Sequence, residues 1–409
     1  MRQRVAMLFG AVLLGLVAIA FARLSDLAQL AFQRMSTAYT YAPLVVTPAI
    51  FALAAWATRR FFPGTAGSGI PQVIAASHNP GKAAGGPLLS LRVGLFKCFG
   101  TLAMLLSGGS VGREGPTVQI SAAIMVTVHR WLRVPIGSGA IIAGGAAGVA
   151  AAFNTPLAGI TFAIEELASA FEQKLAVLVM FAVVTSGLVS KSIAGDYLYF
   201  GYIHTGLQLK TALIAAPLAG VAGGLFGGLF SRLLIAASES GRPWYVRLKS
   251  RPALLAGGCG LLVAVVGIST DGLSWGTGYE TTRGLLEGHQ ASLLFGPAKL
   301  LSTFVTTLSG APGGIFAPSL SVGAGFGQLI ALLMPDSPAG PIVMLGMVAY
   351  FTGVVRAPLT AVIILMEMTE SRGMILPLFI AALIADQVSA MVCHRKLYHT
   401  LAQGFRPSA

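Results

Sequence analysis

The sequence predicts an all-α polytopic membrane protein, and its composition and hydropathy carry that prediction. Hydrophobic residues make up 55% of the 409 residues and charged residues only 10%, with a mean hydropathy of +0.79. A soluble domain carries roughly a quarter charged residues, so most of this surface must face something other than water. Apolar runs of about 18 residues recur from end to end, each long enough to cross a hydrocarbon core of ~30 Å. The alternating strands of about ten residues that build a membrane barrel do not occur.

The apolar runs predict two kinds of helix. Runs without a charged residue predict helices in contact with lipid, and they are residues 5–22, 211–230 and 252–270. Runs interrupted by isolated charges predict tilted helices, or helices buried inside a bundle, and they are residues 89–107, 342–366 and 374–393. The expected architecture is therefore a bundle of tilted, partly interrupted helices.

The first apolar run begins as a secretory signal would. Arg2 and Arg4 precede it, and residues 20–22 offer a small-x-small cleavage site. The run is longer than the usual apolar core of a signal peptide, and much of the chain that follows is equally hydrophobic. We therefore predict a first membrane helix here rather than a cleaved signal.

The basic residues indicate orientation rather than a nucleic-acid partner. The net charge is +13, and the excess gathers at the ends of apolar runs, in residues 59–60, 242–251 and 394–396. Lys and Arg in short loops mark the cytoplasmic side, so we expect both termini and the 242–251 loop to face the cytoplasm from the cell inner membrane. No basic patch interleaved with aromatic residues occurs, which argues against binding of RNA or DNA.

The residue types that carry catalysis or hold metals are not grouped. The three cysteines stand singly in apolar runs, at Cys98, Cys259 and Cys393, and predict neither a metal site nor a disulfide framework. The six histidines lie mostly at segment ends without metal-ligand spacing. An intramembrane hydrolase would need a nucleophile with a base, paired carboxylates or a metal site inside the bundle. We therefore expect a protein that is not an enzyme and needs no cofactor or metal.

The same short motifs occur twice in the chain, 202 positions apart. The first set is LSG at 106–108, GREGP at 112–116, NTPL at 154–157 and Glu165. The second set is LSG at 308–310, GIFAP at 314–318, RAPL at 356–359 and Glu367. One shared offset across separate motifs predicts two homologous halves, 1–202 and 203–409, within a single membrane domain spanning 1–409. Transporters built this way commonly have inverted halves, with the substrate site where the halves meet, and we expect that arrangement.

The glycine- and proline-interrupted segments at corresponding positions point to that site. Pro116 and Pro318 suit the first turn of a helix, and the glycines before them allow close approach to backbone N–H groups. A helix N-terminus presents unpaired N–H donors and about half a positive charge, which attracts an anion without trapping it as a buried cation would. The alternative is a pair of tight packing turns. A third loop, residues 67–71, has the same pattern, although Ser68 alone would also suit a plain helix N-cap.

The three loops together resemble the signature motifs of the CLC family of chloride channels and chloride/proton antiporters. The matching stretches are GSGIP at 67–71, GREGP at 112–116 and GIFAP at 314–318, with the 154–157 region and Tyr398 in support. Only residues 394–409 follow the last apolar run, so the resemblance is to the prokaryotic type, without a C-terminal regulatory domain. It implies transport of chloride and protons through a bilayer by a homodimer with one pathway per subunit.

The resemblance also implies roles for individual residues. It assigns the anion contacts to hydroxyls and backbone N–H groups, here those of Ser68, Tyr398, Ile315 and Phe316. It makes Glu114 the gate, whose carboxylate occupies the outer anion position beside the backbone of Arg113 and Gly115 and leaves when protonated. A carboxylate at a helix N-terminus mimics the transported anion, and an ionisable group at membrane depth is a functional candidate by default. The alternative for Glu114 is a salt bridge with Arg113.

The repeat distinguishes the carboxylates from one another. Glu114 aligns with Phe316, so the gate exists in one half only, whereas Glu165 aligns with Glu367 and is expected to be structural. Glu166 aligns with the apolar Met368. In antiporters of the family the second Glu of this pair often receives protons from the cytoplasm, and passive channels commonly have an apolar residue there. Glu166 therefore favours an antiporter, unless it is a surface glutamate at a helix end.

Three alternatives for transport stay open at this point. A passive chloride channel is separated from an antiporter only by Glu166. Fluoride is less favoured than chloride because Ser68 and Tyr398 both fit a chloride-type site, and nitrate remains an alternative because one side chain at position 68 could shift the preference. The chain departs from the family at Gln72, where an acid often follows the proline of the first motif, and Ile74 nearby is apolar.

Overall fold

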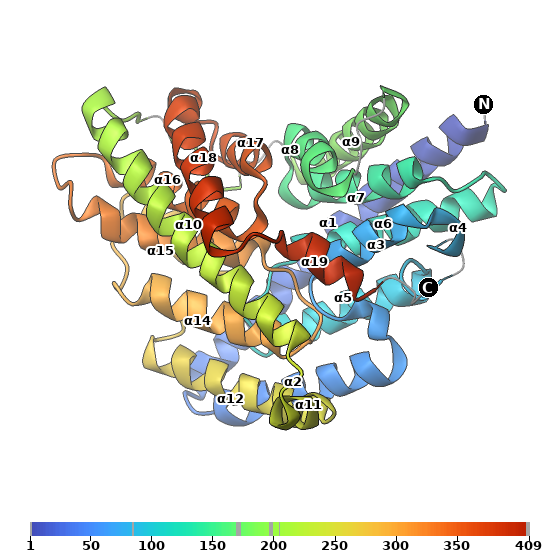
Figure 1. Ribbon diagram of the computed structural model, residues 1–409, viewed down its shortest axis with the longest axis horizontal. Helices are drawn as coiled ribbons and strands as arrows, with labels where there is room; N and C mark the ends of the chain where they lie inside the picture. The colour runs from blue at the N-terminus through green and yellow to red at the C-terminus, as the bar shows by residue number, and fades with distance from the viewer. Residues whose placement is uncertain (1, 84–85, 169–172, 196–198, 204, 406–409) are drawn as a thin grey trace.

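The computed structural model describes residues 2–83, 86–168, 173–195, 199–203 and 205–405, and they form a helical bundle (Figure 1). The first half contains α1 (Arg2–Ala38), α2 (Pro43–Phe61), α3 (Ile70–His78), α4 (Pro80–Ala83), α5 (Leu91–Leu106), α6 (Glu114–Trp131), α7 (Ser138–Phe153), α8 (Pro156–Phe162) and α9 (Gln173–Ala194). The second half contains α10 (Leu209–Glu239), α11 (Pro243–Lys249), α12 (Pro252–Ser269), α13 (Tyr279–Leu286), α14 (Phe295–Leu308), α15 (Phe316–Ala331), α16 (Ala339–Val355), α17 (Pro358–Thr369), α18 (Ile375–Val392) and α19 (Leu397–Gln403). Short 3₁₀ turns at Pro63–Thr65 and Arg372–Met374 and a π turn at Ala163–Leu167 complete it.

The prediction of an all-α membrane protein is confirmed. Within the described residues, six helices are long and apolar enough to cross a membrane: α1, α2, α9, α10, α12 and α18. The first of them, α1, packs against α6, α7 and α9, so the N-terminal apolar run is an integral helix of the bundle. Several others, including α7, α15 and α16, are shorter apolar helices, as expected for a core of interrupted segments.

One predicted segment is wrong in its extent. Residues 342–366, expected as a single run, are divided between α16 and α17. Arg356 adopts a left-handed conformation with φ 61° that ends α16, and Pro358 begins the next helix. The helix breaks here because a proline lacks the N–H that would continue it. Hydropathy does not detect the break, because the residues on both sides of it are apolar.

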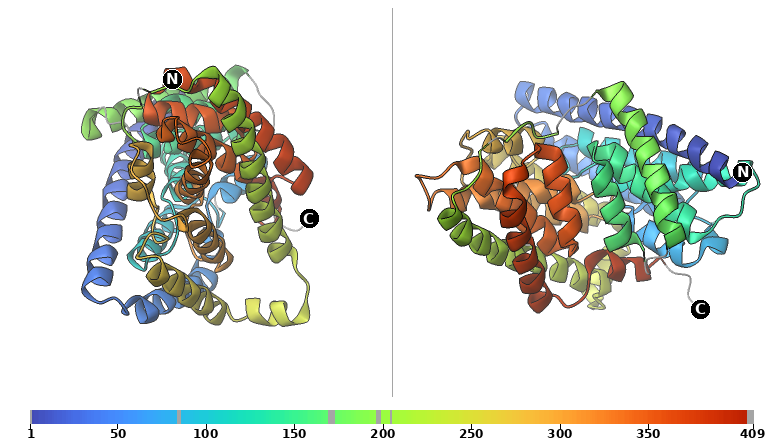
Figure 2. Two further views of the ribbon diagram at one scale, coloured as in Figure 1. Left: turned by 90° about the vertical axis from the view of Figure 1, so that its left-hand side faces the viewer. Right: turned by 90° about the horizontal axis from the view of Figure 1, so that it is seen from above.

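The helices of the two halves follow the same order. The start of α6 at Glu114 corresponds to the start of α15 at Phe316, 202 residues later, and α8 and α17 begin at prolines with the same separation. Asn154, with φ 58°, ends α7 in the same left-handed conformation that Arg356 adopts after α16. In Figure 2, α1 lies along one side of the molecule and α10 along the other, with α6 and α15 in contact between them.

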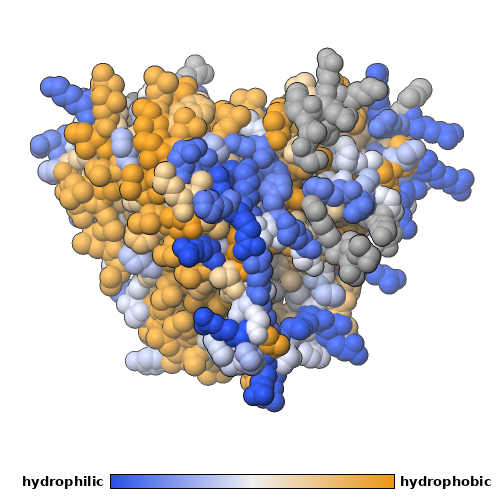
Figure 3. Space-filling model, viewed as in Figure 1, coloured by the Kyte–Doolittle hydropathy of each residue, from blue (hydrophilic) through white to orange (hydrophobic). Residues whose placement is uncertain are grey.

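The surface of α10 shows how the bundle separates lipid-facing and packed sides. Its exposed large apolar side chains are Leu209, Leu213, Ile214, Leu218, Val221, Leu225, Phe226, Leu229 and Leu233. Its buried side is rich in glycine, so that a Cβ on Gly223 or Gly227 would overlap the backbone of α16. Small residues at helix interfaces and large apolar ones outside are typical of membrane bundles. Figure 3 shows the broad apolar surface over this part of the molecule and polar side chains in the middle, around α19.

Candidate functional site

Three loops from both halves of the chain meet at the centre of the bundle. Backbone hydrogen bonds join them: the Gly112 N–H donates to the Gly314 carbonyl at 2.7 Å, and the Gly314 N–H donates to the Gly112 carbonyl at 2.9 Å. The Gly313 N–H donates to the Gly67 carbonyl at 3.0 Å. Since α3, α6 and α15 begin directly after these loops, their N-termini converge on one place.

Glycine makes this convergence sterically possible. A Cβ on Gly115 would overlap the Ser68 Oγ and lie 3.0 Å from the Ser68 carbonyl oxygen. A Cβ on Gly314 would lie 2.9 Å from the Gly112 carbonyl oxygen and 3.0 Å from the Gly115 nitrogen. No real Cβ tolerates such contacts, so the close approach of the three backbones depends on these residues.

Ser68 and Tyr398 bring two hydroxyls to the same place. The N-cap of α3 is Gly69 rather than Ser68, and it has a φ of 106° with no side-chain cap, so the alternative of a plain N-cap serine is wrong. The hydroxyl of Tyr398, from α19, is directed toward Ser68. Both residues are buried, and neither hydroxyl has a hydrogen-bond partner of good geometry among the described residues. Because buried hydroxyls are normally hydrogen-bonded, the pair suits an acceptor that the protein does not supply.

Ile315 and Phe316 form the start of α15 beside these hydroxyls. Both are buried, and backbone N–H groups in the first turn of a helix have no acceptor within it. The ring of Phe316 is fixed by aromatic contacts, edge-on to Phe351 at a centroid distance of 4.8 Å and to Phe162 at 5.7 Å. It also lies 6.1 Å from the Tyr398 ring. The predicted N–H donors therefore belong to a rigid part of the core.

Glu114 is the first residue of α6, and its carboxylate reaches across to the other half. The side chain is completely buried, and neither oxygen has a hydrogen-bond partner of good geometry among the described residues. A Cβ on Gly112 would overlap Glu114 Oε2 and lie 3.2 Å from the Ala317 Cβ and 3.1 Å from the Pro318 Cδ. The carboxylate thus sits beside the first turn of α15 while belonging to the first turn of α6. Both helix ends favour negative charge at that position.

Arg113 directs its side chain away from Glu114, so the alternative of a salt bridge between these neighbours is wrong. Its Nη1 donates to Asp26 Oδ1 at 2.7 Å and to the Ala22 carbonyl at 2.8 Å, both in α1. The guanidinium also lies over the Tyr199 ring, 5.9 Å from its centroid. Sequence reasoning missed Asp26 and Tyr199, because neither belongs to a motif and the pairing joins residues far apart in the chain.

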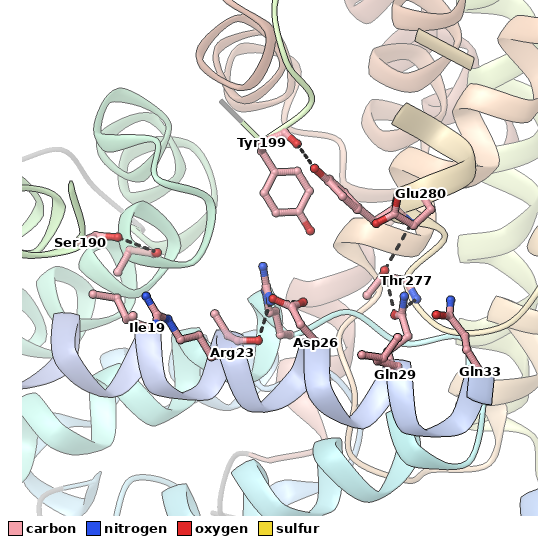
Figure 4. Close-up of a pocket in the computed structure, with 14 residues that line it drawn as sticks. Ile19, Arg23, Asp26, Gln29, Gln33, Ser190, Tyr199, Thr277 and Glu280 are labelled. Carbon is pink, nitrogen blue, oxygen red and sulfur yellow. Dashed lines mark hydrogen bonds and ion pairs between the residues drawn. The ribbon is translucent and has the colours of Figure 1, made fainter. Parts of the chain in front are cut away.

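A cavity of about 520 Å³ lies on the α1 side of the molecule, and Arg113 is one of the residues that line it. Side chains of α1, including Arg23, Asp26 and Gln29, project into it, and Tyr199 and Glu280 face them from the other side (Figure 4). Both signs of charge line its walls. The cavity therefore reaches Arg113, the residue next to Glu114 in the chain.

Glu166 lies inside the protein, so the alternative of a surface glutamate is wrong. It belongs to the π turn Ala163–Leu167, its side chain is completely buried, and neither oxygen has a hydrogen-bond partner among the described residues. The Nε2 of His399 is 3.8 Å from its Oε1. Tyr398, next to His399 in the chain, is within electrostatic reach of both Glu166 and Glu114. Short π turns occur frequently at functional sites.

Glu165, the neighbour of Glu166, has the structural role predicted for it. Its carboxylate accepts hydrogen bonds from the backbone N–H groups of Leu359 at 3.1 Å and Thr360 at 2.7 Å, at the start of α17. It therefore caps a helix of the other half. The two adjacent glutamates point to different environments, one paired and one without a hydrogen bond.

Buried polar side chains hold the Ser68 loop in place. The Lys97 ammonium donates to the carbonyls of Thr65, at 2.9 Å, and Gly67. Gln72, where the family often has an acid, donates to the Ala66 carbonyl at 2.6 Å. Sequence reasoning treated Lys97 only as an isolated charge. The repeat could have identified it, because Lys299 lies 202 residues later and its ammonium donates to the Gly276 carbonyl at 2.6 Å.

Comparison with known proteins gives one consistent result. Residues 50–390 match the family described as voltage-gated chloride channels. The H(+)/Cl(−) exchange transporter ClcA of Vibrio vulnificus is 33% identical over 375 residues, which is 87% of this chain and 78% of that protein. ClcA of Yersinia pestis is 32% identical over 418 residues, covering 95% of this chain and 85% of that protein.

Solved structures agree on the fold. A slow cyanobacterial Cl⁻/H⁺ antiporter superposes with a TM-score of 0.84 at 24% identity, covering 99% of this chain and 98% of that one. A CLC-type fluoride/proton antiporter superposes with a TM-score of 0.80 at 21% identity, covering 97% and 96%. The match of the family model over most of the chain, together with relatives above 30% identity, shows that the protein belongs to the CLC family of voltage-gated chloride channels and transporters.

Proposed function

We propose that this protein exchanges chloride for protons across the membrane, with Glu114 as the gate. One observation carries the proposal: a fully buried carboxylate of one half lies at the first helical turn of the other half, where negative charge is favoured. The neighbouring cation, Arg113, is paired with Asp26 instead. The two ClcA relatives are named as H⁺/Cl⁻ exchange transporters, which supports the same activity.

The chloride site proposed here combines hydroxyl and backbone donors. The side chains of Ser68 and Tyr398 and the N–H groups of Ile315 and Phe316 hold a central chloride, and the backbone of Arg113 and Gly115 borders the outer position that Glu114 occupies. The unpartnered hydroxyls of Ser68 and Tyr398 support this assignment. A site of partial charges binds an anion firmly enough to select it and weakly enough to release it.

In the proposed cycle, a proton neutralises Glu114 and the carboxyl group swings out of the anion position. Chloride then enters the position that the carboxylate left. Deprotonation returns the carboxylate and displaces the ion. Chloride and the ionised carboxylate repel each other at this distance, so occupation by chloride favours the protonated gate, and the two ions are linked by electrostatics alone.

Glu166 is proposed as the internal proton acceptor, which separates an antiporter from a passive channel. Its complete burial without a hydrogen-bond partner among the described residues supports the role, because an ionisable group at membrane depth is costly and is therefore a functional candidate by default. A passive chloride channel is the alternative. Among anions we propose chloride, because Ser68 and Tyr398 present two hydroxyls to it, with fluoride and nitrate as the competitors to be tested.

The proposal extends to the subunit arrangement and the orientation of the protein in the membrane. The halves 1–202 and 203–409 are inverted repeats of a single domain, and a homodimer in the lipid bilayer carries one pathway in each subunit. The protein resides in the cell inner membrane with both termini on the cytoplasmic side. The basic residues of 242–251 and 394–396 support this orientation.

The test is proton movement driven by chloride in liposomes containing the purified protein. With no pH gradient imposed, an outward chloride gradient should drive protons into the liposomes. Labelled chloride should accumulate inside them without chemical turnover. A passive channel moves chloride with no coupled proton signal. Absence of any chloride flux would remove the assignment of the three loops as an anion pathway.

A further inference from the structure

We propose that His399 carries protons between the surface at α19 and Glu166. This inference rests on the proposed proton coupling and names the route by which its internal acceptor is loaded. Glu166 is completely buried and so has no contact with water of its own at the protein surface, whereas the side chain of His399 is 36% exposed. The Nε2 of His399 is 3.8 Å from Glu166 Oε1, so this one residue reaches both the solvent and the carboxylate.

The other charged and titratable groups around Glu166 do not offer this route. Glu165 is committed to capping α17. Lys396 interacts with Glu166 electrostatically from the residue before α19, and Tyr398 is directed toward Ser68. Amines and phenols as chemical classes exchange protons near about pH 10, far from the neutral range. Of the groups near Glu166 in the described structure, His399 is the one whose ordinary titration falls near neutral pH.

The helices packed against the π turn contribute no competing group. The sequences of α7 and α8 contain no titratable residue, and α3 contains only His78, whose Nδ1 lies 2.7 Å from the Ile74 carbonyl oxygen of its own helix. Two helices packed against α19, α10 and α16, contain further titratable residues, which are Lys210, Arg232, Glu239 and Tyr350. Glu239 is paired with Arg395 at 2.5 Å.

The position of α19 gives the route a direction. Adjacent residues of this helix serve two sites, because Tyr398 is directed toward Ser68 and His399 toward Glu166. In Figures 1 and 2, α19 lies on the side of the molecule opposite α1, whose residues line the cavity that Arg113 also lines. Protons passing through His399 therefore enter from one side, and ions reach the gate position from the other.

The transfer itself needs no further reactant. Neutral His399, with its proton on Nε2, takes a second proton on Nδ1 from a hydronium ion and leaves water. The imidazolium then releases the proton on Nε2 to the Glu166 carboxylate. The products are a carboxylic acid and a neutral imidazole. The 3.8 Å separation exceeds a hydrogen bond, so a small rotation of the His399 ring toward Glu166 must complete the contact before the proton moves.

The experiment compares proton and chloride fluxes of full-length His399→Gln with wild type in liposomes, between about pH 5.5 and 8. We expect proton flux to fall by roughly tenfold or more and to lose its dependence on pH in the range where imidazole titrates. Chloride flux falls less, so more chloride moves per proton. Retained chloride flux also shows that the variant is folded.

A second variant separates proton transfer from a structural role. In His399→Gly, imidazole added on the α19 side should restore proton flux, because a free imidazole can occupy the space left by the side chain. The matched control is His289→Gln, which removes another histidine near a glutamate, with His289 Nδ1 4.0 Å from Glu287 Oε2 at an exposed position. Its proton flux should equal that of wild type.

The outcomes distinguish this inference from the proposed function. If wild-type protein moves chloride with no proton movement, the proposed exchange fails. If wild type couples the two ions and His399→Gln matches it at every pH, only the role of His399 is overturned. A slow variant that keeps the wild-type pH profile and gains nothing from imidazole would likewise assign His399 to structure alone.

Discussion

Glu165 and Glu367 cap each other's half of the molecule. The Glu165 carboxylate accepts the N–H of Thr360, at the start of α17, at 2.7 Å. The Glu367 carboxylate accepts the N–H of Ala158, at the start of α8, also at 2.7 Å. The two residues are related by the repeat, so one interaction is made twice with its partners exchanged, and it joins α8 to α17 directly across the halves.

These caps should contribute to stability and not to transport. Because an N-cap contributes about 1 kcal/mol, and these carboxylates accept two N–H groups each, Glu165→Ala and Glu367→Ala should each lower the free energy of unfolding by about 1–2 kcal/mol. Thermal unfolding in detergent measures the loss, with Glu287→Ala as a surface control. The number of chlorides moved per proton should stay unchanged. A changed ratio with normal stability would contradict a structural role.

Glu114→Gln should remove the pH dependence of chloride flux and abolish proton flux. The neutral amide cannot ionise, so the gate remains in its protonated-like state at every pH. In wild type, chloride flux should fall as pH rises, by up to about tenfold per pH unit once most gates are ionised. Flux assays across pH measure both effects, with Glu287→Gln as the control. A variant whose flux still falls with rising pH would show that another group gates the pathway.

Gly115→Ala should weaken chloride binding by displacing Ser68. The added Cβ overlaps the Ser68 Oγ and presses on its carbonyl oxygen, and relief of such overpacking costs about 1–3 kcal/mol. Calorimetric titration with chloride should show an affinity lower by roughly tenfold. The matched control is Gly137→Ala, because no atom lies within 4 Å of a Cβ at that position. Equal affinity in the two variants would place chloride away from Ser68.

Removing either proposed hydroxyl donor should also weaken chloride binding. Ser68→Ala and Tyr398→Phe each delete one hydrogen bond to an anion, which contributes about 1.5–3 kcal/mol, so affinity should fall by roughly tenfold or more. Tyr350→Phe is the matched control, since Tyr350 is another buried tyrosine whose hydroxyl has no partner in the described structure. Were Tyr350→Phe to cost as much affinity as Tyr398→Phe, the loss would reflect general packing.

The sequence predicts the helical class, the repeat and the convergence of the three loops because these depend on local patterns. Hydropathy identifies membrane segments, and Pro116 and Pro318 mark helix starts wherever they occur. The placement of Glu114 at the start of α6 follows from the same local rule. The expectation that Glu165 is structural also needed no coordinates, because its match with Glu367 already distinguished it from Glu166.

The partners of these residues depend on tertiary packing and were not predictable. The pairing of Arg113 with Asp26 joins residues 87 positions apart and belongs to no motif. His399 comes close to Glu166 only because α19 folds back against the first half, and the sequence assigns no role to a single histidine near the C-terminus. The break at Arg356 was missed because a left-handed residue leaves no trace in hydropathy.

The reversal potential of the purified protein in liposomes, under a chloride gradient with and without an opposing pH gradient, tests the central claim most directly. We predict that the pH gradient displaces the potential from the chloride equilibrium, and that Glu166→Gln and Glu114→Gln abolish the displacement. A wild-type potential that stays at the chloride equilibrium whatever the pH gradient would contradict coupled exchange and make the protein a passive chloride channel.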